Sequence, residues 1–152
     1  MKTKPLSELY PEEKGIIVKV EGSGEIRRRL LEMGLVAGAE VEMARTAPLG
    51  DPVQIRLRGY DLALRKKEAA KILVKIKEGM LVNAESGEMV TVVAIKAGWG
   101  LERRLKDMGL APGTIVRVAS AGQPGPVIIE IMDSKLALGH GIARKILVRS
   151  SE

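Results

Sequence analysis

Short runs of alternating hydrophobic and polar residues follow one another along this chain, and each half contains one brief helical pattern. In the first half, Ile26, Leu30 and Met33 are spaced so that they share one face of a helix. Alternation at every second residue is typical of half-buried strands. The strands predicted in the first half lie at residues 17–20, 41–43, 53–57, 62–64 and 72–74. This order predicts a mainly β unit with one short helix.

The same order of elements occurs a second time. Residues 28–38 and residues 103–113 share the Arg-Arg-Leu start, the Met-Gly-Leu centre and a final glycine. The period is too long for a solenoid repeat and fits a small domain. We therefore interpret the chain as a tandem duplication, with copy one at residues 1–78 and copy two at residues 79–152. A unit of this size has little interior volume for an enclosed active site.

Glycine and proline mark corresponding turns in both copies. Gly34 and Gly109 directly follow the helical pattern, at the place where a left-handed residue ends a helix with a Schellman motif. The segment Ala111-Pro112-Gly113-Thr114 has the Pro and Gly positions of a type II turn. Five short strands joined by such turns predict a closed barrel, because closure leaves few open strand edges. The predicted fold is two tandem small SH3-like β-barrels, each with one short α-helix.

Hydrophobic residues on the predicted inward faces form the expected core. In copy one they are Leu30, Met33, Val41, Ile55, Leu57, Leu62, Leu64 and Ile72, and the corresponding residues form the core of copy two. A tight turn or single helical turn is expected between the last two strands. Residues 75–80 are expected to be a short linker that leads straight into copy two.

The inventory of reactive side chains excludes several classes of protein. The chain has no Cys, which excludes disulfides, thiolate metal sites and cysteine nucleophiles. Its one His, His140, has Lys66 at the corresponding place in copy one, so we interpret it as a surface turn residue. No base–nucleophile pair or ligand cluster can be assembled from this inventory. We therefore expect no catalytic residues, no metal site, no cofactor and no enzymatic activity.

No segment predicts a membrane span. The longest apolar run, residues 89–95, includes Thr91 and is far too short to cross a bilayer. There is also no N-terminal apolar stretch of the kind that directs secretion. We expect a cytoplasmic protein without direct membrane insertion.

The formal net charge of +6 raises the question of nucleic-acid binding. The excess is thin, with 16 Lys and Arg against 12 Asp and Glu in residues 1–78. The aromatic residues Tyr10, Tyr60 and Trp99 do not interleave with the basic clusters as a base-stacking platform requires. We interpret the basic residues as a solvated face and do not expect nucleic acid as a partner.

The segment Gly22-Ser23-Gly24 stands between a predicted strand and a predicted helix, which is the layout of a phosphate-binding loop. It lacks the third glycine of a dinucleotide fingerprint and the Lys-Ser or Lys-Thr of a P-loop. A plain connecting turn is the favoured interpretation.

Several segments of copy one together resemble the FeoA family, the small cytosolic proteins that accompany the ferrous-iron transporter FeoB. These segments are residues 28–35, the turn at Gly38, residues 47–52 and residues 62–65. Copy two shares the helix and the Leu-Ala-Leu strand. It departs in the loop at residues 121–126 and at Gly139, where copy one has Arg65.

The resemblance implies an SH3-like barrel and a partner role at the cytosolic GTP-binding region of FeoB. It implies a non-enzymatic accessory protein of ferrous iron uptake, held at the inner face of the membrane through its partner. The C-terminal domain of iron-dependent repressors has the same barrel type. The alternative is therefore a basic barrel that binds nucleic acid or belongs to an iron-responsive regulator. Self-association stays open.

Two apolar residues of copy one are candidates for a partner-binding face. Leu49 lies at the tip of the loop at residues 47–52, where the prolines, including Pro48, limit the entropy lost on docking. Leu31 lies outside the apolar face of the helix and is replaced by Lys106 in copy two. Arg28 and Arg65 are expected to add polar contacts at the rim. The alternative is that Leu31 and Leu49 pack on each other or on the second barrel.

Overall fold

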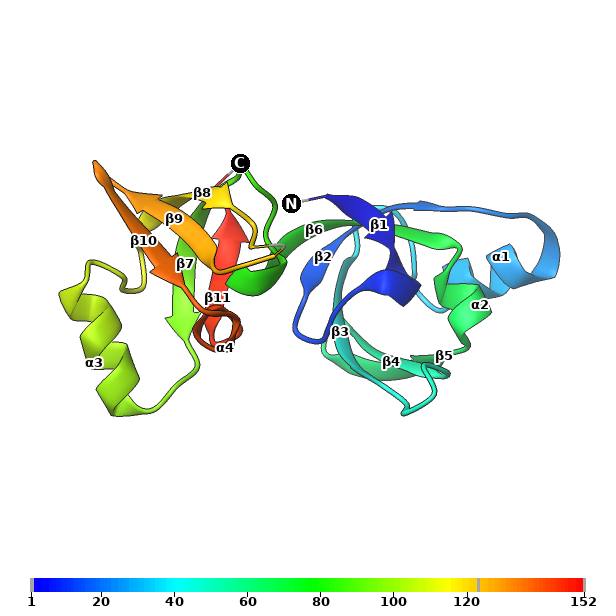
Figure 1. Cartoon of the computed structure of the whole chain (residues 1–152). Helices are drawn as coiled ribbons and strands as arrows, with labels where there is room; N and C mark the ends of the chain where they lie inside the picture. The colour runs from blue at the N-terminus through cyan, green and yellow to red at the C-terminus, as the bar shows by residue number, and fades with distance from the viewer. Residues whose placement is uncertain (1, 123, 152) are drawn as a thin grey trace. The chain divides into compact units, whose positions relative to one another are not determined.

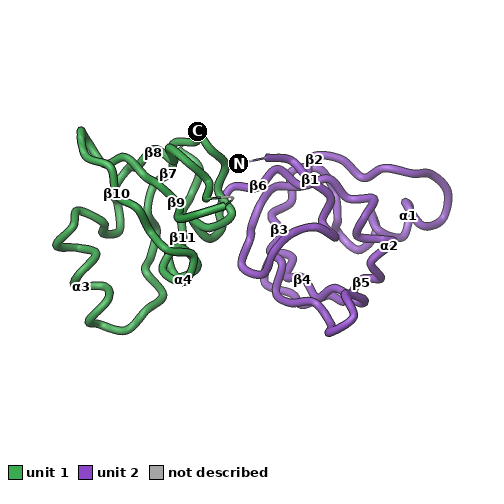
Figure 2. The backbone as a smooth tube through the Cα atoms, in the orientation of Figure 1, with its two compact units in different colours: residues 1, 78–152 green, residues 2–77 purple. Residues whose placement is uncertain are grey.

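The computed structural model describes residues 2–122 and 124–151. It divides into two compact units, residues 2–77 and the segment from Glu78 onward (Figure 2). The boundary falls inside one strand, β6, which runs from Ile72 to Met80. The prediction of a linker at residues 75–80 was therefore wrong, because the alternating hydrophobic pattern of the last strand continues through Ile76.

The first unit is a small β-barrel whose strands and helices follow one another as in Figure 1. Its strands are β1 (Thr3–Pro5), β2 (Lys14–Val20), β3 (Glu40–Thr46), β4 (Val53–Leu57), β5 (Tyr60–Leu64) and β6 (Ile72–Met80). Its helices are η1 (Leu6–Glu8), α1 (Gly24–Glu32) and α2 (Lys66–Ala69). The strands are hydrogen-bonded in the order β1-β6-β2-β3-β4-β5. The last strand thus returns beside the first long strand, as in an SH3-like barrel.

The second unit repeats this topology. Its strands are β7 (Met89–Ile95), β8 (Ile115–Ser120), β9 (Val127–Ile131), β10 (Ser134–Leu138) and β11 (Ile146–Ser150). Its helices are η2 (Leu81–Asn83), α3 (Trp99–Asp107) and α4 (His140–Ala143). The strand order is β6-β11-β7-β8-β9-β10, in which the end of β6 pairs antiparallel with β11 from Glu78 to Met80. The predicted fold class is confirmed, and the helical turn expected before the last strand is α2 in one unit and α4 in the other.

Both long helices end in the predicted way. Gly34 has φ +94° and its N–H donates to Leu31 O at 3.0 Å, while Leu35 N donates to Leu30 O at 3.1 Å. These two bonds define a Schellman motif. Gly109 ends α3 with the same pair of bonds. The motif turns the chain so that the leucine after the glycine enters the barrel, where it is fully buried in both units.

The barrel interiors contain most of the predicted core residues. In the first unit Leu30, Val41, Ile55, Leu57, Leu64 and Ile72 are buried. Leu62 is half-buried, so its placement in the core was only partly right. Met33 is 36% exposed and its counterpart Met108 is 48% exposed, so their assignment to the core was wrong. Each long helix buries one residue of its own, Leu30 or Leu105, and its C-terminal end carries the methionine outward.

The N-terminal segment contributes core residues that the sequence pattern did not indicate. Leu6 in η1 is fully buried. Lys4 Nζ lies 2.8 Å from Glu13 Oε1, and both side chains are nearly buried. The Lys4 ammonium also lies 4.3 Å from the centre of the Tyr10 ring, and Tyr10 N donates to Glu13 Oε1 at 2.6 Å.

Among the described residues, no helix is long and apolar enough to cross a membrane.

Candidate partner-binding site

The loop between β3 and β4, residues 47–52, presents Leu49 to solvent. Gly50 N donates to Ala47 O at 2.7 Å, which closes a tight turn around Pro48 and Leu49. Ala47 N donates to Pro52 O at 3.1 Å, which joins the two ends of the loop. The loop is thus fixed at its base while Leu49 is 94% exposed at its tip. An exposed apolar side chain held in this way is a candidate contact for a partner or for the second barrel.

Asp51 attaches this loop to the helical turn α2. Its Oδ1 accepts a hydrogen bond from Lys66 N at 3.0 Å, and its Oδ2 lies 3.2 Å from Arg65 Nη2. The carboxylate therefore joins the loop to the first residues of α2. The arrangement places the base of the Leu49 loop beside Arg65, another of the predicted site residues.

Glu68 continues the connection from α2 to α1. Its Oε1 accepts a hydrogen bond from Arg65 N at 3.0 Å, and its Oε2 forms an ion pair with the guanidinium of Arg29. Glu68 is buried although its partner Arg29 is largely exposed. Asp51 and Glu68 thereby join the loop, the helical turn α2 and the long helix α1 in one polar network.

The five predicted site residues all belong to these three elements. Arg65 participates directly in the network, and Pro48 and Leu49 lie in the loop that Asp51 holds. Arg28 is exposed and Leu31 is half-buried, and both lie on α1. Arg28 is adjacent to Arg29 of the polar network, and Leu31 is adjacent to the core residue Leu30. The exposure of Leu49 excludes the alternative that it packs on Leu31. Whether these residues bind a partner stays a prediction.

An open groove of about 400 Å³ adjoins the loop on the outer face of β3, β4 and β5. Its lining residues are Arg45, Thr46, Ala47, Pro48, Pro52, Gln54 and Ala63. Arg45 Nε donates to Gln54 Oε1 at 2.6 Å across the two strands. The groove was not predicted from the sequence; of its lining residues, Gln54 and Ala63 occupy alternate positions of predicted strands.

The corresponding place in copy two has different chemistry. His140 is half-buried, and its Nε2 lies 2.9 Å from Gly122 O and 2.8 Å from Gly125 O. Because both neighbours are carbonyl acceptors, this ring nitrogen carries the hydrogen and donates it to them. The interpretation of His140 as a plain surface turn residue was therefore wrong. It fastens the loop to α4, a contact that depends on residues 15 to 18 positions away in the sequence.

The described residues contain no group of three or more His, Cys, Asp or Glu side chains that could hold a metal ion. The Gly22-Ser23-Gly24 segment precedes α1, and Ser23 occupies the N-cap position without a side-chain hydrogen bond to the helix. The structure thus presents a surface with an apolar tip and a polar network. The expectation of no metal, cofactor or catalysis stays a prediction.

Comparison with known proteins gives the same duplication. The FeoA domain model matches twice, at residues 4–76 and 80–150. A putative Fe(2+) transport protein A from Methanocaldococcus jannaschii is 43% identical over 72 residues, which is 47% of this chain and 87% of the relative. An Fe(2+) transport protein A/Fe(2+) transporter FeoB fusion protein from Porphyromonas gingivalis is 46% identical over 71 residues, which is 47% of this chain. The match spans 8% of the length of that fusion protein.

A solved structure extends the similarity over nearly the whole chain. The solution structure of iron(II) transport protein A from Clostridium thermocellum is 33% identical and superposes with a TM-score of 0.60. The alignment covers 97% of this chain and 88% of that protein. Family matches to both halves and a full-length structural relative agree with the fold and with the internal repeat. This chain belongs to the FeoA family, as a tandem duplication of the FeoA domain.

Proposed function

We propose that this protein is a non-enzymatic, cytosolic accessory protein of ferrous iron uptake. It modulates a FeoB-type GTPase-permease by binding its cytosolic GTP-binding region through copy one. The partner-binding face consists of Arg28, Leu31, Pro48, Leu49 and Arg65. The observation that carries this proposal is Leu49, which is 94% exposed at the tip of a loop fixed by Asp51.

The identity of the partner is supported by the Porphyromonas gingivalis relative. That protein joins an Fe(2+) transport protein A segment and an Fe(2+) transporter FeoB in one chain. Fusion places two modules at a high effective concentration, which favours an association that is weak between separate chains. An exposed and preorganised anchor such as Leu49 suits an association of this kind.

The arrangement of the face is suited to such an association. An apolar anchor with cationic side chains on the elements joined to its loop fits the usual division of an interface into a hydrophobic centre and a polar rim. The hydrogen bonds at the base of the loop limit the conformational entropy that docking would otherwise cost. Arg28 and Arg65 are both exposed and able to reach acidic groups on a partner.

The test measures binding to the purified cytosolic GTP-binding region of the FeoB-type transporter from the same organism. We expect Leu31→Lys combined with Leu49→Ser to abolish binding in calorimetry while the circular dichroism spectrum stays unchanged. A matched control is Met132→Ser, because Met132 in copy two is also 94% exposed. This control should bind like the unmodified protein. Normal binding by the Leu31/Leu49 double variant would show that the proposed face is wrong.

A further inference from the structure

The outer faces of the two barrels differ sharply at three corresponding positions. In copy two these positions are Met89, Ile115 and Met132, which are 45%, 57% and 94% exposed. The strand registers align them with three charged residues of copy one, which are Lys14, Glu40 and Arg58. Copy one therefore shows that the barrel does not need apolar side chains at these places.

Met89 and Ile115 belong to one face of the sheet formed by β7 and β8. Met89 pairs directly with Arg117, and Ile115 precedes Arg117 by two residues on the same strand. The alternate residues Val116 and Val118 are buried, so Ile115 and Arg117 point to the opposite, outer face. We call the residues Met89, Ile115, Arg117, Glu130 and Met132 the copy-two outer face.

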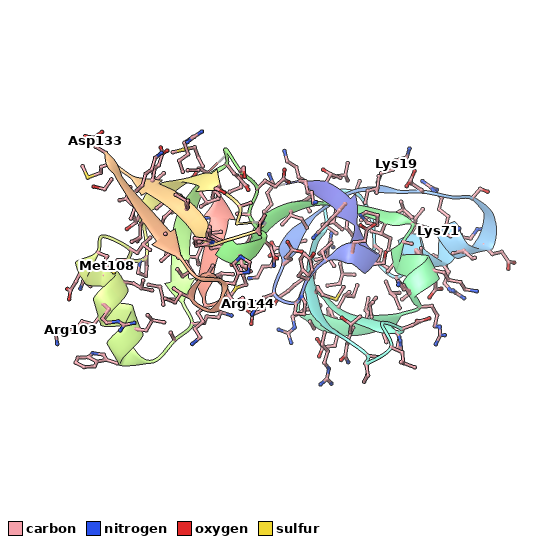
Figure 3. All side chains as sticks on the ribbon, viewed as in Figure 1. Lys19, Lys71, Arg103, Met108, Asp133 and Arg144 are labelled. Carbon is pink, nitrogen blue, oxygen red and sulfur yellow. The ribbon has the colours of Figure 1, made fainter. Side chains whose placement is uncertain are left out.

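Met132 extends this face at the hairpin between β9 and β10. It follows Glu130 by two residues and begins the turn that Ile131 and Ser134 close. Its φ is +54°, a conformation that L side chains rarely adopt. The next residue, Asp133, lies at the tip of this hairpin (Figure 3). A long apolar side chain at such a turn contributes nothing to the barrel interior.

The charges of the copy-two outer face are balanced within it. Arg117 pairs with Glu130 across β8 and β9, and Arg117 Nη1 lies 3.2 Å from Glu130 Oε1. Beyond Met132 the hairpin carries one acid, Asp133, and one base, Lys135. The face thus has no excess charge with which to select an acidic or a basic partner, although the whole chain has a formal charge of +6. A partner for it has to be apolar and itself charge-balanced.

We propose that the copy-two outer face binds the same face of a second copy of this chain. A two-fold contact brings the same residues of both chains together. It can place Arg117 of each molecule beside Glu130 of the other, while Met89, Ile115 and Met132 form the apolar centre. This neutral pattern is complementary to itself, whereas two molecules of net positive charge repel each other over most other surfaces. The contact is small, so the dimer is weak and forms at high protein concentration.

The test is sedimentation velocity over a series of protein concentrations up to about 1 mM. The unmodified chain should shift from monomer towards dimer as its concentration rises. Ile115→Glu combined with Met132→Arg introduces the charged pair of copy one and should keep the protein monomeric over the whole series. Because copy one carries this pair in the same fold, the variant should retain its circular dichroism spectrum. If it misfolds, Met89→Lys serves as the second variant and should weaken the dimer at least threefold.

A reciprocal variant and a salt series complete the experiment. Glu40→Ile combined with Arg58→Met gives copy one an apolar outer face and should raise the average mass beyond that of the unmodified chain. Dimer formation should persist from about 0.1 to about 0.5 M salt, because the centre of the contact is apolar. An unmodified chain that stays monomeric throughout, a double variant that dimerises normally, or a dimer that salt dissolves would overturn the proposal. Binding to the transporter region is measured separately and does not affect these outcomes.

Discussion

The two copies attach one loop to the helical turn by different means; the loop lies between β3 and β4 in copy one and between β8 and β9 in copy two. Copy one uses the carboxylate of Asp51, which contacts both Arg65 and the backbone of Lys66. Copy two has no acid at that place, and His140 reaches from α4 to the loop carbonyls of Gly122 and Gly125. In both copies the helical turn donates and the loop accepts, but the acceptor is a side-chain carboxylate in copy one and a pair of backbone carbonyls in copy two.

The difference continues at the next position of the helical turn that faces the barrel. Glu68 in copy one is buried and binds Arg29 and the backbone of Arg65. Ile142 stands at the corresponding position of copy two and packs against the hydrophobic core. The fold therefore requires that the helical turn be anchored, and either a polar network or an apolar contact satisfies that requirement. Function can diverge at this surface because the barrel beneath it does not change.

The largest expected effect tests what the copies share. Leu30 and Leu105 are the buried residues of the two long helices, so Leu30→Ala and Leu105→Ala should each lower the free energy of unfolding by about 2–5 kcal/mol. We also predict that residues 1–78 fold when they are expressed alone. Urea unfolding of this fragment shows whether it folds alone and measures the effect of Leu30→Ala, and urea unfolding of the whole chain measures the effect of Leu105→Ala. An unfolded fragment would contradict the division into independent domains.

Met33→Ala is the control for this experiment. Met33 follows Leu30 by less than one helical turn but is 36% exposed, so its truncation creates no closed cavity. We expect a loss below about 1 kcal/mol. A loss equal to that of Leu30→Ala would mean that the helix packs more deeply than its exposed methionine indicates.

The next effect concerns the polar network of copy one. Glu68→Ala removes the acceptor of Arg65 N and the ion-pair partner of Arg29, and should lower the free energy of unfolding by about 1–3 kcal/mol. Glu68→Ile introduces the residue of copy two and should cost less than the alanine, because it refills the buried volume. Lys67→Ala, on an exposed position of the same helical turn, should change stability by less than about 0.5 kcal/mol. Equal losses for alanine and isoleucine would show that the polar contacts alone matter.

The features predicted correctly from sequence depend on residues close together along the chain. The Schellman motif needs Gly34 and the leucine after it, and the alternating strands need only their own pattern. The wrong placement of Met33 in the core has a geometric cause. The prediction from helical spacing assumes that the whole helix packs against the barrel. In the structure α1 has one buried residue, Leu30, and the chain after the helix enters the barrel at Leu35.

The features that the sequence did not reveal depend on contacts between distant segments. His140 meets carbonyls of a loop 15 to 18 residues earlier, and Glu68 meets Arg29 across 39 residues. Nothing in a local pattern distinguishes such side chains from solvated ones. The proposed anchor Leu49, in contrast, could be predicted from local sequence alone. It lies between prolines in a loop and belongs to no predicted strand or helix, so its apolar side chain has no expected role in the core.

The smallest expected effect separates the two ways of holding the loop. Asp51→Ala and His140→Ala should each weaken one loop by about 1 kcal/mol and leave the barrel folded. Hydrogen exchange then reports the loops separately, and Gly50 N, which donates to Ala47 O, is the amide to follow in copy one. Its exchange should become about fivefold faster in Asp51→Ala and stay unchanged in His140→Ala.

Salt provides the control that distinguishes the copies. The Asp51–Arg65 contact joins two opposite charges, and the Arg65 side chain is 63% exposed, so added salt screens this attraction. The contacts of His140 are to neutral carbonyl groups and respond less to salt. Exchange of Gly50 N should therefore accelerate between about 0.05 and about 0.5 M salt in the unmodified protein, and this acceleration should disappear in Asp51→Ala. If the variant keeps the same salt response, the ion pair does not hold the loop, and the rigid presentation of Leu49 must come from the loop's own hydrogen bonds.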